Sequence, residues 1–353
     1  MPLRDIVGHR RLLRLISRSI AGDTLPPSLI FSGPAGVGKR RTATSVAQVL
    51  NCTAPVVNVR PEALGADESA GPLPVDACGA CGPCRRIARG IFPDVLALEV
   101  EEDRTEITID RVRLAIDQTG YRPFEGRRRV IIIDDAAEVS GAAMHTLLKS
   151  LEEPPDSSSF VLVTSRPDAL LPTIRSRCAC LRFGPLDDRD LVAALVGQHG
   201  LSEQAARGAV PLAGGSLGLA LVFASEATEK IRRGVCGALG GAAAATGPDD
   251  RFEVGKAVAA RGSSAGQPAA DRDALAIHLR MLLSLLRDVA ALTTGAAAGA
   301  LTNADLTSTL ESLAGGFGRD RAVRAFSAVE RALGALDRNA SPKIVADWLA
   351  FQL

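Results

Sequence analysis

Short, almost continuous apolar runs alternate with helical patterns over the first half of the chain. Runs of this kind are typical of strands that are covered on both faces, and helices between them indicate a parallel sheet. The pattern therefore predicts an α/β fold built on a parallel sheet. The expected strands are residues 28–33, 94–100, 129–135, 160–165 and 178–183.

Strand signals stop after about residue 186, and the rest of the chain is rich in Ala and Leu and helical in pattern. The glycine-rich segments "AGGSLG", "GALGGAAAATGPDD" and "ARGSSAGQPAADRD" interrupt this half, as loops do. We expect three parts: an α/β domain at 1–184, a small helical domain at 185–222 and a larger all-helical domain at 223–353.

Composition and charge narrow the functional classes. The chain has 353 residues, more than one hydrophobic core usually serves, and its formal net charge is only +1. A nearly neutral chain has no global field that draws it onto nucleic acid or anionic lipid, so such contacts have to be local. No apolar run reaches the 18 or more residues that a membrane helix needs.

The first twenty residues are basic and amphipathic, as in a transit peptide. Apolar residues at helical spacing favour instead the buried side of a helix in the mature protein, with its arginines in solvent. We therefore expect a cytoplasmic protein without a membrane partner. The apolar positions of this helix are Leu12, Leu13, Leu15, Ile16 and Ile20.

The segment "GPAGVGKR" is an imperfect phosphate-binding loop between an expected strand and an expected helix. Gly33, Gly36 and Gly38 would let backbone N–H groups approach phosphate oxygens, and Lys39 would add a positive charge. Arg40 stands where such loops have the Ser or Thr that ligates Mg²⁺. The loop is either a degenerate nucleotide site that holds ATP or ADP without hydrolysis or a glycine turn without a ligand.

A second acidic motif supports the nucleotide interpretation. Asp134 and Asp135 end the apolar run "VIIID", where a P-loop protein places the aspartate that organises its metal. Asp135 replaces the glutamate that polarises water in many ATPases, and it is one methylene shorter. Hydrolysis is again disfavoured; the alternative is a strand that simply ends in a polar loop.

Four cysteines indicate a structural zinc site. Cys78, Cys81 and Cys84 form C-x₂-C-x₂-C, and Cys52 follows the helix after the phosphate-binding loop. Four thiolates suit a closed tetrahedral site, whereas a third cysteine has no role in a redox couple. Free buried thiols are the other alternative, and the segment between Cys52 and Cys78 is expected to be a surface insertion. Three further cysteines are expected to be packing residues: Cys178, Cys180 and Cys236.

Three segments occur in an order that resembles a known family: "GPAGVGK", "IIIDDAAEVSGAAMHTLLKSLEEPP" and "FVLVTSRPDALLPTIRSRC". They are similar to subunits of the bacterial DNA polymerase III clamp loader, an AAA+ family, and most closely to those of the delta-prime type. The resemblance covers about the first 183 residues. It implies an AAA+ α/β domain with a zinc module, then a helical lid and a helical collar that includes "LDRNASPKIVADWL".

The resemblance also implies a function. ATP-hydrolysing gamma/tau subunits carry a lid arginine where this chain has Leu217 and Gly218, so a non-hydrolysing ring member is expected. In the "SRC" segment, Arg177 is expected to act in trans as an arginine finger on the γ-phosphate held by a neighbour, with Ser176 and Cys178 positioning it. The implied partners are the gamma/tau and delta subunits, and within the complex the sliding clamp and primed DNA.

Three alternatives stay open. The chain is a gamma/tau-like motor, which Arg40 and the missing lid arginine disfavour, or a DNA-binding zinc protein, which its neutral charge and closed Cys₄ site disfavour. The third alternative is that Arg177 only forms a local ion pair. The arginines of "GRRRV" at 126–130 are expected to be a solvated strand entry or to contact a DNA backbone.

Overall fold

The structure is a computed structural model, and it describes residues 1–60, 71–101, 104, 106–244, 268–295, 301–336, 338 and 340–352. The chain divides into two compact units. The first comprises Met1–Ala206 and Ala213–Ala220, and the second comprises Arg207–Leu212 and Leu221–Leu353.

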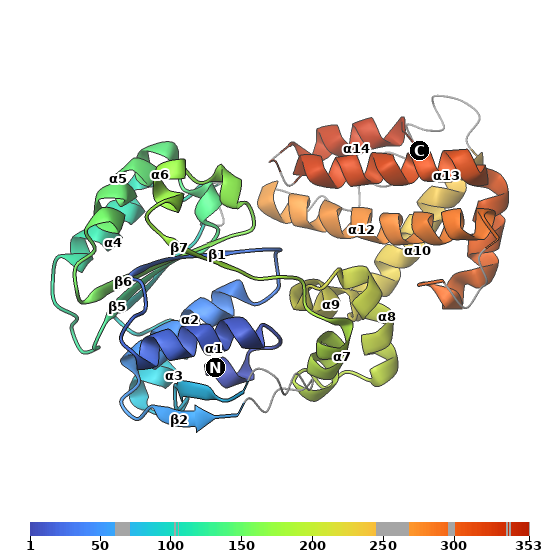
Figure 1. Cartoon of the computed structure of the whole chain (residues 1–353). Coiled ribbons are helices and arrows are strands. Elements are labelled where there is room, and N and C mark those ends of the chain that lie inside the picture. The colour runs from blue at the N-terminus through green and yellow to red at the C-terminus, as the bar shows by residue number, and fades with distance from the viewer. Residues whose placement is uncertain are drawn as a thin grey trace. The chain divides into compact units, whose positions relative to one another are not determined.

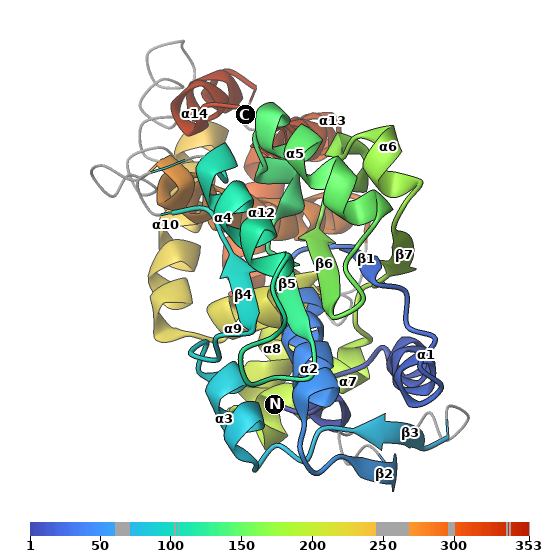
Figure 2. The same ribbon diagram turned by 90° about the vertical axis from the view of Figure 1, so that its left-hand side faces the viewer.

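A five-stranded parallel sheet lies at the centre of the first unit, in the order β4-β5-β6-β1-β7, which Figure 2 shows from left to right. Every strand begins and ends within two residues of a predicted run, so the predicted parallel α/β sheet is confirmed. The strands are β1 (Ser28–Ser32), β4 (Val95–Leu98), β5 (Arg129–Ile133), β6 (Ser158–Thr164) and β7 (Ala179–Arg182).

Both faces of this sheet are buried, which explains the continuous apolar runs. Along β5, Val130 and Ile132 enter one core while Ile131 and Ile133 enter the other, because successive side chains point to opposite faces. Two helical layers cover the two faces (Figure 1). One contains α1 (Arg10–Ala21), α2 (Lys39–Asn51) and α3 (Gly82–Ala88), and the other α4 (Ile109–Thr119), α5 (Gly141–Glu152) and α6 (Pro172–Arg175).

The segment before the cysteine motif is not the surface insertion that was expected. Val56–Val59 (β2) and Leu73–Asp76 (β3) form an antiparallel pair, and Leu73 packs into the core beneath α1. The buried Asp76 carboxylate accepts the backbone N–H of Leu3 at 2.9 Å. The expectation is wrong for β3. This strand is held by contacts with the start of the chain, some seventy residues earlier, and a local sequence pattern does not reveal such contacts. Residues 61–70 of this segment lie outside the described residues.

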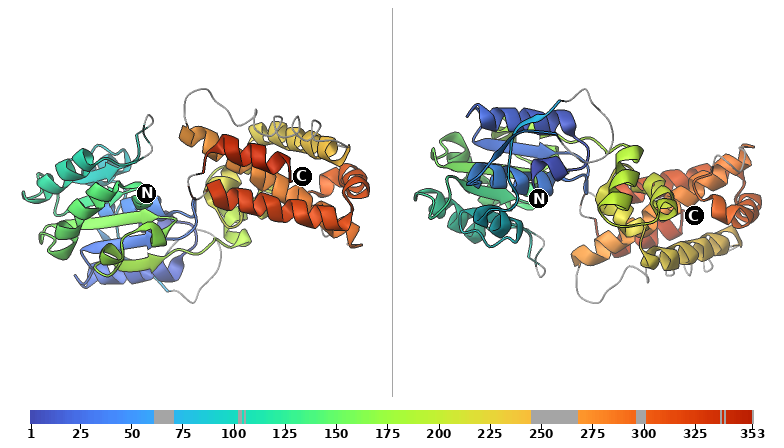
Figure 3. Two further views of the ribbon diagram at one scale, coloured as in Figure 1. Left: turned by 90° about the horizontal axis from the view of Figure 1, so that it is seen from above. Right: turned by 90° about the horizontal axis from the view of Figure 1, so that it is seen from below.

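The described residues after β7 form helices and loops only, as the pattern predicted. In the second unit, α12, α13 and α14 run side by side (Figures 1 and 3, orange to red), and α13 is interrupted at Gly318, where φ is +65°. The division at 184 and 222 stays a prediction. The described helices after β7 are α7 (Asp188–Gly197), α8 (Glu203–Ala213), α9 (Leu217–Phe223), α10 (Glu226–Ala244), α12 (Pro268–Thr293), α13 (Thr307–Leu336) and α14 (Pro342–Ala350).

Among the described residues, the 3₁₀ turns are η1 (Leu3–Asp5), η3 (Ala136–Glu138), η4 (Pro167–Ala169) and η6 (Ala304–Leu306). Within the described ranges, no helix combines the length and the apolar character that crossing a bilayer requires.

A buried ion pair fixes the loop that leads into β5. Arg129 Nη2 lies 2.8 Å from Asp94 Oδ1, and both side chains are almost fully buried. The Asp94 carboxylate also accepts the backbone N–H groups of Phe124, Glu125 and Gly126. Burial acts to raise the pKa of Asp94, but these hydrogen bonds outweigh it and hold the pKa below its usual value.

The "GRRRV" arginines therefore have internal partners. Arg129 is neither solvated nor available to DNA, so both expectations are wrong for it. Arg127 donates to the Cys52 carbonyl, and Arg128 Nη1 lies 3.3 Å from Ser159 Oγ. The sequence pattern missed these contacts because each partner is far away along the chain.

Replacing Asp94 tests the importance of this network. Asp94→Ala should lower the free energy of unfolding at pH 7 by about 3–5 kcal/mol, because Arg129 is left as a buried charge without a partner. A depressed pKa gives stability that is present above about pH 4 and lost as the pH falls through the folded-state pKa. Urea unfolding of wild type and mutant at pH 7 and at pH 3 should therefore show a smaller difference in acid.

Asp117→Ala, which removes an exposed carboxylate from α4, is the matched control, with an expected change within about 0.5 kcal/mol. A loss of similar size in Asp94→Ala and Asp117→Ala would contradict the structural role of Asp94.

Candidate functional site

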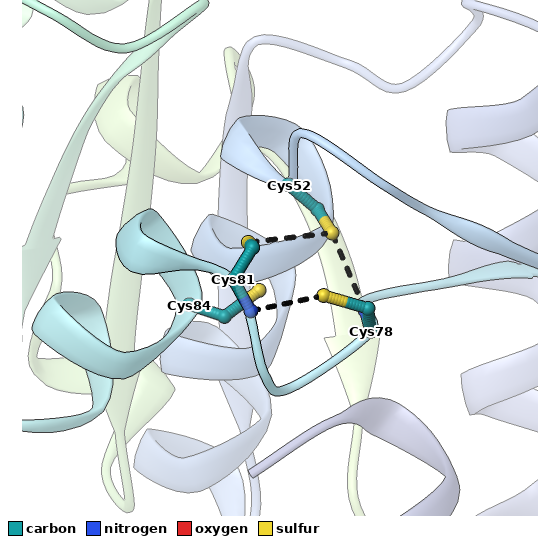
Figure 4. A group of neighbouring side chains, drawn as sticks. All are labelled: Cys52, Cys78, Cys81 and Cys84. Carbon is teal, nitrogen blue, oxygen red and sulfur yellow. Dashed lines mark hydrogen bonds between the residues drawn. The ribbon is translucent and has the colours of Figure 1, made fainter.

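The four cysteines of the predicted zinc site come together at one end of α2. Cys52 directly follows that helix, Cys78 and Cys81 lie in the loop between β3 and α3, and Cys84 is in the first turn of α3. Figure 4 shows the four side chains pointing toward a common centre. Their sulfur atoms all lie within 4.8 Å of one another, and the Sγ atoms of Cys52 and Cys81 are 3.9 Å apart.

This geometry fits zinc. Four sulfur atoms arranged tetrahedrally at about 2.3 Å from a Zn²⁺ ion lie about 3.8 Å from one another. Backbone N–H groups also point at the sulfur atoms, from Cys78 to Cys52 Sγ at 3.3 Å and from Cys81 to Cys78 Sγ at 3.2 Å. Such donors stabilise thiolate charge, as metal ligands require. The structure thus brings together all four predicted ligands.

The thiols of this cluster differ in their readiness to ionise. Burial raises the pKa of Cys52 and of Cys84. For Cys81, burial is also the largest influence, but hydrogen bonds from Cys84 and Thr53 outweigh it and lower the pKa to about 6. A cluster of thiols at this separation does not carry four negative charges by itself. A divalent cation would supply the compensating charge.

The phosphate-binding loop has the backbone that its glycines predicted. Gly33, Gly36 and Gly38 all have positive φ, of 144°, 74° and 101°. A Cβ on Gly33 would lie 2.1 Å from the Phe183 carbonyl oxygen, so only glycine fits there. The loop leads from β1 into α2, as expected of a strand–loop–helix motif.

Lys39 is directed into its own loop. Its Nζ donates to the carbonyls of Gly33 at 2.7 Å and Pro34 at 2.6 Å, and the side chain is buried. Burial lowers the pKa of Lys39, while the charges of Asp134 and Asp135 partly oppose this shift. The lysine thus uses its hydrogen bonds within the chain.

The Arg40 guanidinium lies between two carboxylates. Its Nη1 lies 3.1 Å from Asp134 Oδ2 and 2.8 Å from Glu99 Oε2, so one guanidinium holds the carboxylates that follow β5 and β4. Burial raises the pKa of Asp134, and the Arg40 charge opposes this. Asp135 lies beside Asp134 but is exposed, with φ of 56°. With a guanidinium on Asp134 and no hydroxyl at residue 40, these residues do not fit the Mg²⁺ of a P-loop ATPase.

The segment around Gly218, for which the resemblance implied a missing arginine, lies directly on this loop. The Gly218 N–H donates to the Gly36 carbonyl at 3.2 Å, and a Cβ on Gly36 would lie 2.2 Å from Ser216 Oγ. Leu217 is buried. The backbone of this segment therefore packs closely against the glycines of the loop.

Arg177 lies two residues after the end of α6, is exposed and is paired within the chain. Its Nη2 lies 2.5 Å from Glu152 Oε1, and its Nη1 donates to the Thr173 carbonyl at 2.9 Å. Ser176 Oγ is 3.5 Å away, at the limit of a hydrogen bond. Cys178 is buried in the core, and burial raises its pKa to about 11.

The other cysteines only partly follow the expectation. Cys178 packs in the core as predicted, and Cys236 is half-buried. Cys180 is exposed, so its assignment as a packing residue is wrong. β7 is the edge strand of the sheet, where one side is left open to solvent.

Three residues at these sites were not predicted from the sequence: Glu99, Glu152 and His9. Glu99 follows a strand as Asp134 does, and the same reasoning applied to residues 94–100 would have found it. His9 Nε2 lies 3.0 Å from the Val37 carbonyl of the loop, and burial lowers its pKa. No local pattern indicates that Glu152 lies next to Arg177.

A family model described as DNA polymerase III, delta subunit, matches residues 8–187, just over half of the chain. The chain belongs to this family. The resemblance to clamp-loader subunits of the delta-prime type, which rested on three sequence segments, is thereby confirmed.

Relatives of two kinds are similar to this family member. DNA polymerase III subunit delta' of Pseudomonas aeruginosa is 38% identical over 149 residues, which are 42% of this chain and 40% of that protein. Subunit delta' of Escherichia coli is 33% identical over 163 residues, 46% of this chain and 49% of that protein. Subunit tau of Escherichia coli is 30% identical over 200 residues, 57% of this chain and 28% of that protein. The chain thus spans less than half the length of each of these relatives.

We expect the cysteine cluster to hold one zinc ion per chain. The purified protein should contain one equivalent of zinc by elemental analysis, and Cys81→Ser should lose it, because three thiolates form an open site of lower affinity. Cys180→Ser, at an exposed cysteine outside the cluster, is the matched control and should keep the metal. Absence of zinc from the wild type, or its full retention in Cys81→Ser, would contradict the assignment.

We expect the isolated chain not to hydrolyse ATP, because Arg40 holds Asp134 and no hydroxyl ligand for Mg²⁺ follows Lys39. Phosphate release with saturating MgATP should be no greater for wild type than for Lys39→Ala, which lacks the loop cation. Steady turnover by the wild type that Lys39→Ala abolishes would instead identify an ATPase motor.

Proposed function

We propose that this chain is a non-hydrolysing clamp-loader subunit of the delta-prime type. The observation that carries the proposal is the Arg40 guanidinium, which lies on the Asp134 and Glu99 carboxylates. Lys39 and Gly218 support it, since both make their contacts within the loop. A subunit built in this way contributes to an assembly through its neighbours and does not turn over nucleotide itself; ATP or ADP in its loop would be passive.

Arg177 is the residue that connects this subunit to catalysis. In the proposed ring it supplies a positive charge to the γ-phosphate of ATP held by the adjacent subunit. The guanidinium is suited to this task, because its planar fork binds a phosphate through two parallel hydrogen bonds. Ser176 and Cys178 hold the backbone on either side, one at the surface and one in the core.

The remaining parts of the chain serve assembly in this proposal. The Cys₄ cluster holds a structural zinc ion that ties β3 and α3 to the end of α2. The lid at 185–222 and the collar at 223–353 join the gamma/tau and delta subunits in a ring that loads the sliding clamp onto primed DNA.

A gamma/tau-like ATPase motor is the second candidate. The similarity to subunit tau of Escherichia coli favours it, because the match covers 57% of this chain. Arg40 opposes it, since a motor needs Mg²⁺ at that carboxylate.

The test of the proposal is Arg177→Ala in a complex reconstituted with its partner subunits. Trans arginine fingers contribute about 10³–10⁵ in rate at one site, so turnover at the shared site should be lost while the other sites continue. Arg177→Lys should fail nearly as badly, because an ammonium group cannot reproduce the planar fork. ATP hydrolysis and clamp loading, both stimulated by clamp and primed DNA, are the measurements.

Arg175→Ala is the matched control, because Arg175 is an exposed arginine two residues before Arg177 and pairs with Asp168 at 2.6 Å. It should leave both activities unchanged. Wild-type rates in a fully assembled Arg177→Ala complex would overturn the proposed role of Arg177.

A further inference from the structure

Two segments that are separate in the sequence meet at Arg177. Glu152 is the last residue of α5 and belongs to "LLKSLEEPP", a segment for which the proposed function gives no role. The neighbouring Leu151 packs in the same core as Ile174 of α6. This shared core brings Glu152 Oε1 to 2.5 Å from Arg177 Nη2.

The intramolecular contacts use the atoms that a phosphate would need. Nη2 pairs with Glu152, and Nη1 donates to the Thr173 carbonyl, with Ser176 Oγ nearby. The guanidinium is thereby folded back along α6. A γ-phosphate that binds the same fork has to replace at least the Glu152 carboxylate.

The pair is weak enough to be replaced. The Arg177 side chain is 35% exposed and that of Glu152 is 46% exposed. Ion pairs this accessible to solvent are screened and contribute little net stability. A γ-phosphate carries more negative charge than one carboxylate, and its oxygens accept hydrogen bonds from both Nη groups. It therefore competes well with Glu152 for the guanidinium.

We propose that Glu152 is a positioning residue that holds Arg177 folded against α6 until the γ-phosphate of a neighbour's nucleotide replaces it. This inference rests on the proposed function of Arg177 as a trans finger. A ligand shifts such an equilibrium only through its different affinity for the two states. ATP displaces Glu152, whereas ADP has no γ-phosphate and leaves the pair intact, so Glu152 opposes ATP binding and not ADP binding.

The test is Glu152→Gln, which removes the charge and keeps the size of the side chain. In the reconstituted complex, the affinity for the slowly hydrolysed analogue ATPγS should rise about two- to fivefold, the range of a lost exposed ion pair. The affinity for ADP should not change. Glu153→Gln removes the same charge one residue further on and should alter neither affinity. In an Arg177→Ala background, Glu152→Gln should have no effect.

A second measurement needs no assembly. Phenylglyoxal reacts at the Nη atoms of an arginine side chain, and in the wild type the Glu152 carboxylate covers Nη2 of Arg177. Mass spectrometry of the isolated full chain should therefore find faster labelling of Arg177 in Glu152→Gln than in wild type, with unchanged labelling of Arg175.

The outcomes separate the two proposals. If Arg177→Ala changes neither ATPγS affinity nor turnover of the complex, the trans finger is wrong. If Arg177→Ala impairs the complex but Glu152→Gln leaves ATPγS affinity unchanged or weakens it, the finger stands and the role of Glu152 is overturned. Equal labelling of Arg177 in wild type and Glu152→Gln would also overturn the role of Glu152.

Discussion

The parallel pairing of β4, β5, β6 and β1 is the constraint from which the chemistry of this chain follows. Parallel strands end at the same edge of a sheet, so the loops that leave their carboxyl ends meet there. The glycine loop leaves β1, Glu99 follows β4, and Asp134 follows β5. The Gly33 N–H donates to the Thr164 carbonyl at the end of β6, which ties the loop to the next strand.

At this edge the chain carries its own cations. A P-loop ATPase leaves its acidic residues to a metal that arrives with the nucleotide, and hydrolysis uses the charge of that metal. Here the positive charge is that of Arg40, a side chain of the protein itself, and its guanidinium contacts two carboxylates. The contact joins the loop after β1 to the residues that follow β4 and β5.

Arg177 presents a related arrangement at a different surface. Its guanidinium is also neutralised within the chain, but by a single solvent-accessible carboxylate. Both the Arg40 pairs and the Arg177 pair are accessible to solvent, and they differ in the number of carboxylates that hold the guanidinium. Asp94 and Arg129 represent the opposite extreme, because their burial makes the pair part of the core.

The strands, the helical second half and the four zinc-ligand candidates followed from the sequence alone. Buried parallel strands give continuous apolar runs, and the tight C-x₂-C-x₂-C spacing restricts what those cysteines can do. The sequence also predicted that Arg40 disfavours Mg²⁺, since that prediction needs only the residue type at one motif position.

Only the tertiary structure decided which charges meet. Asp76 of β3 binds the start of the chain, more than seventy residues earlier. The buried Arg129 pairs with Asp94, which lies 35 residues earlier in the sequence. Glu99 meets Arg40, and Glu152 meets Arg177, through packing between elements that are distant in sequence. Local periodicity reports which face of an element is apolar, whereas a long-range ion pair depends on how several elements pack, and no local pattern contains that information.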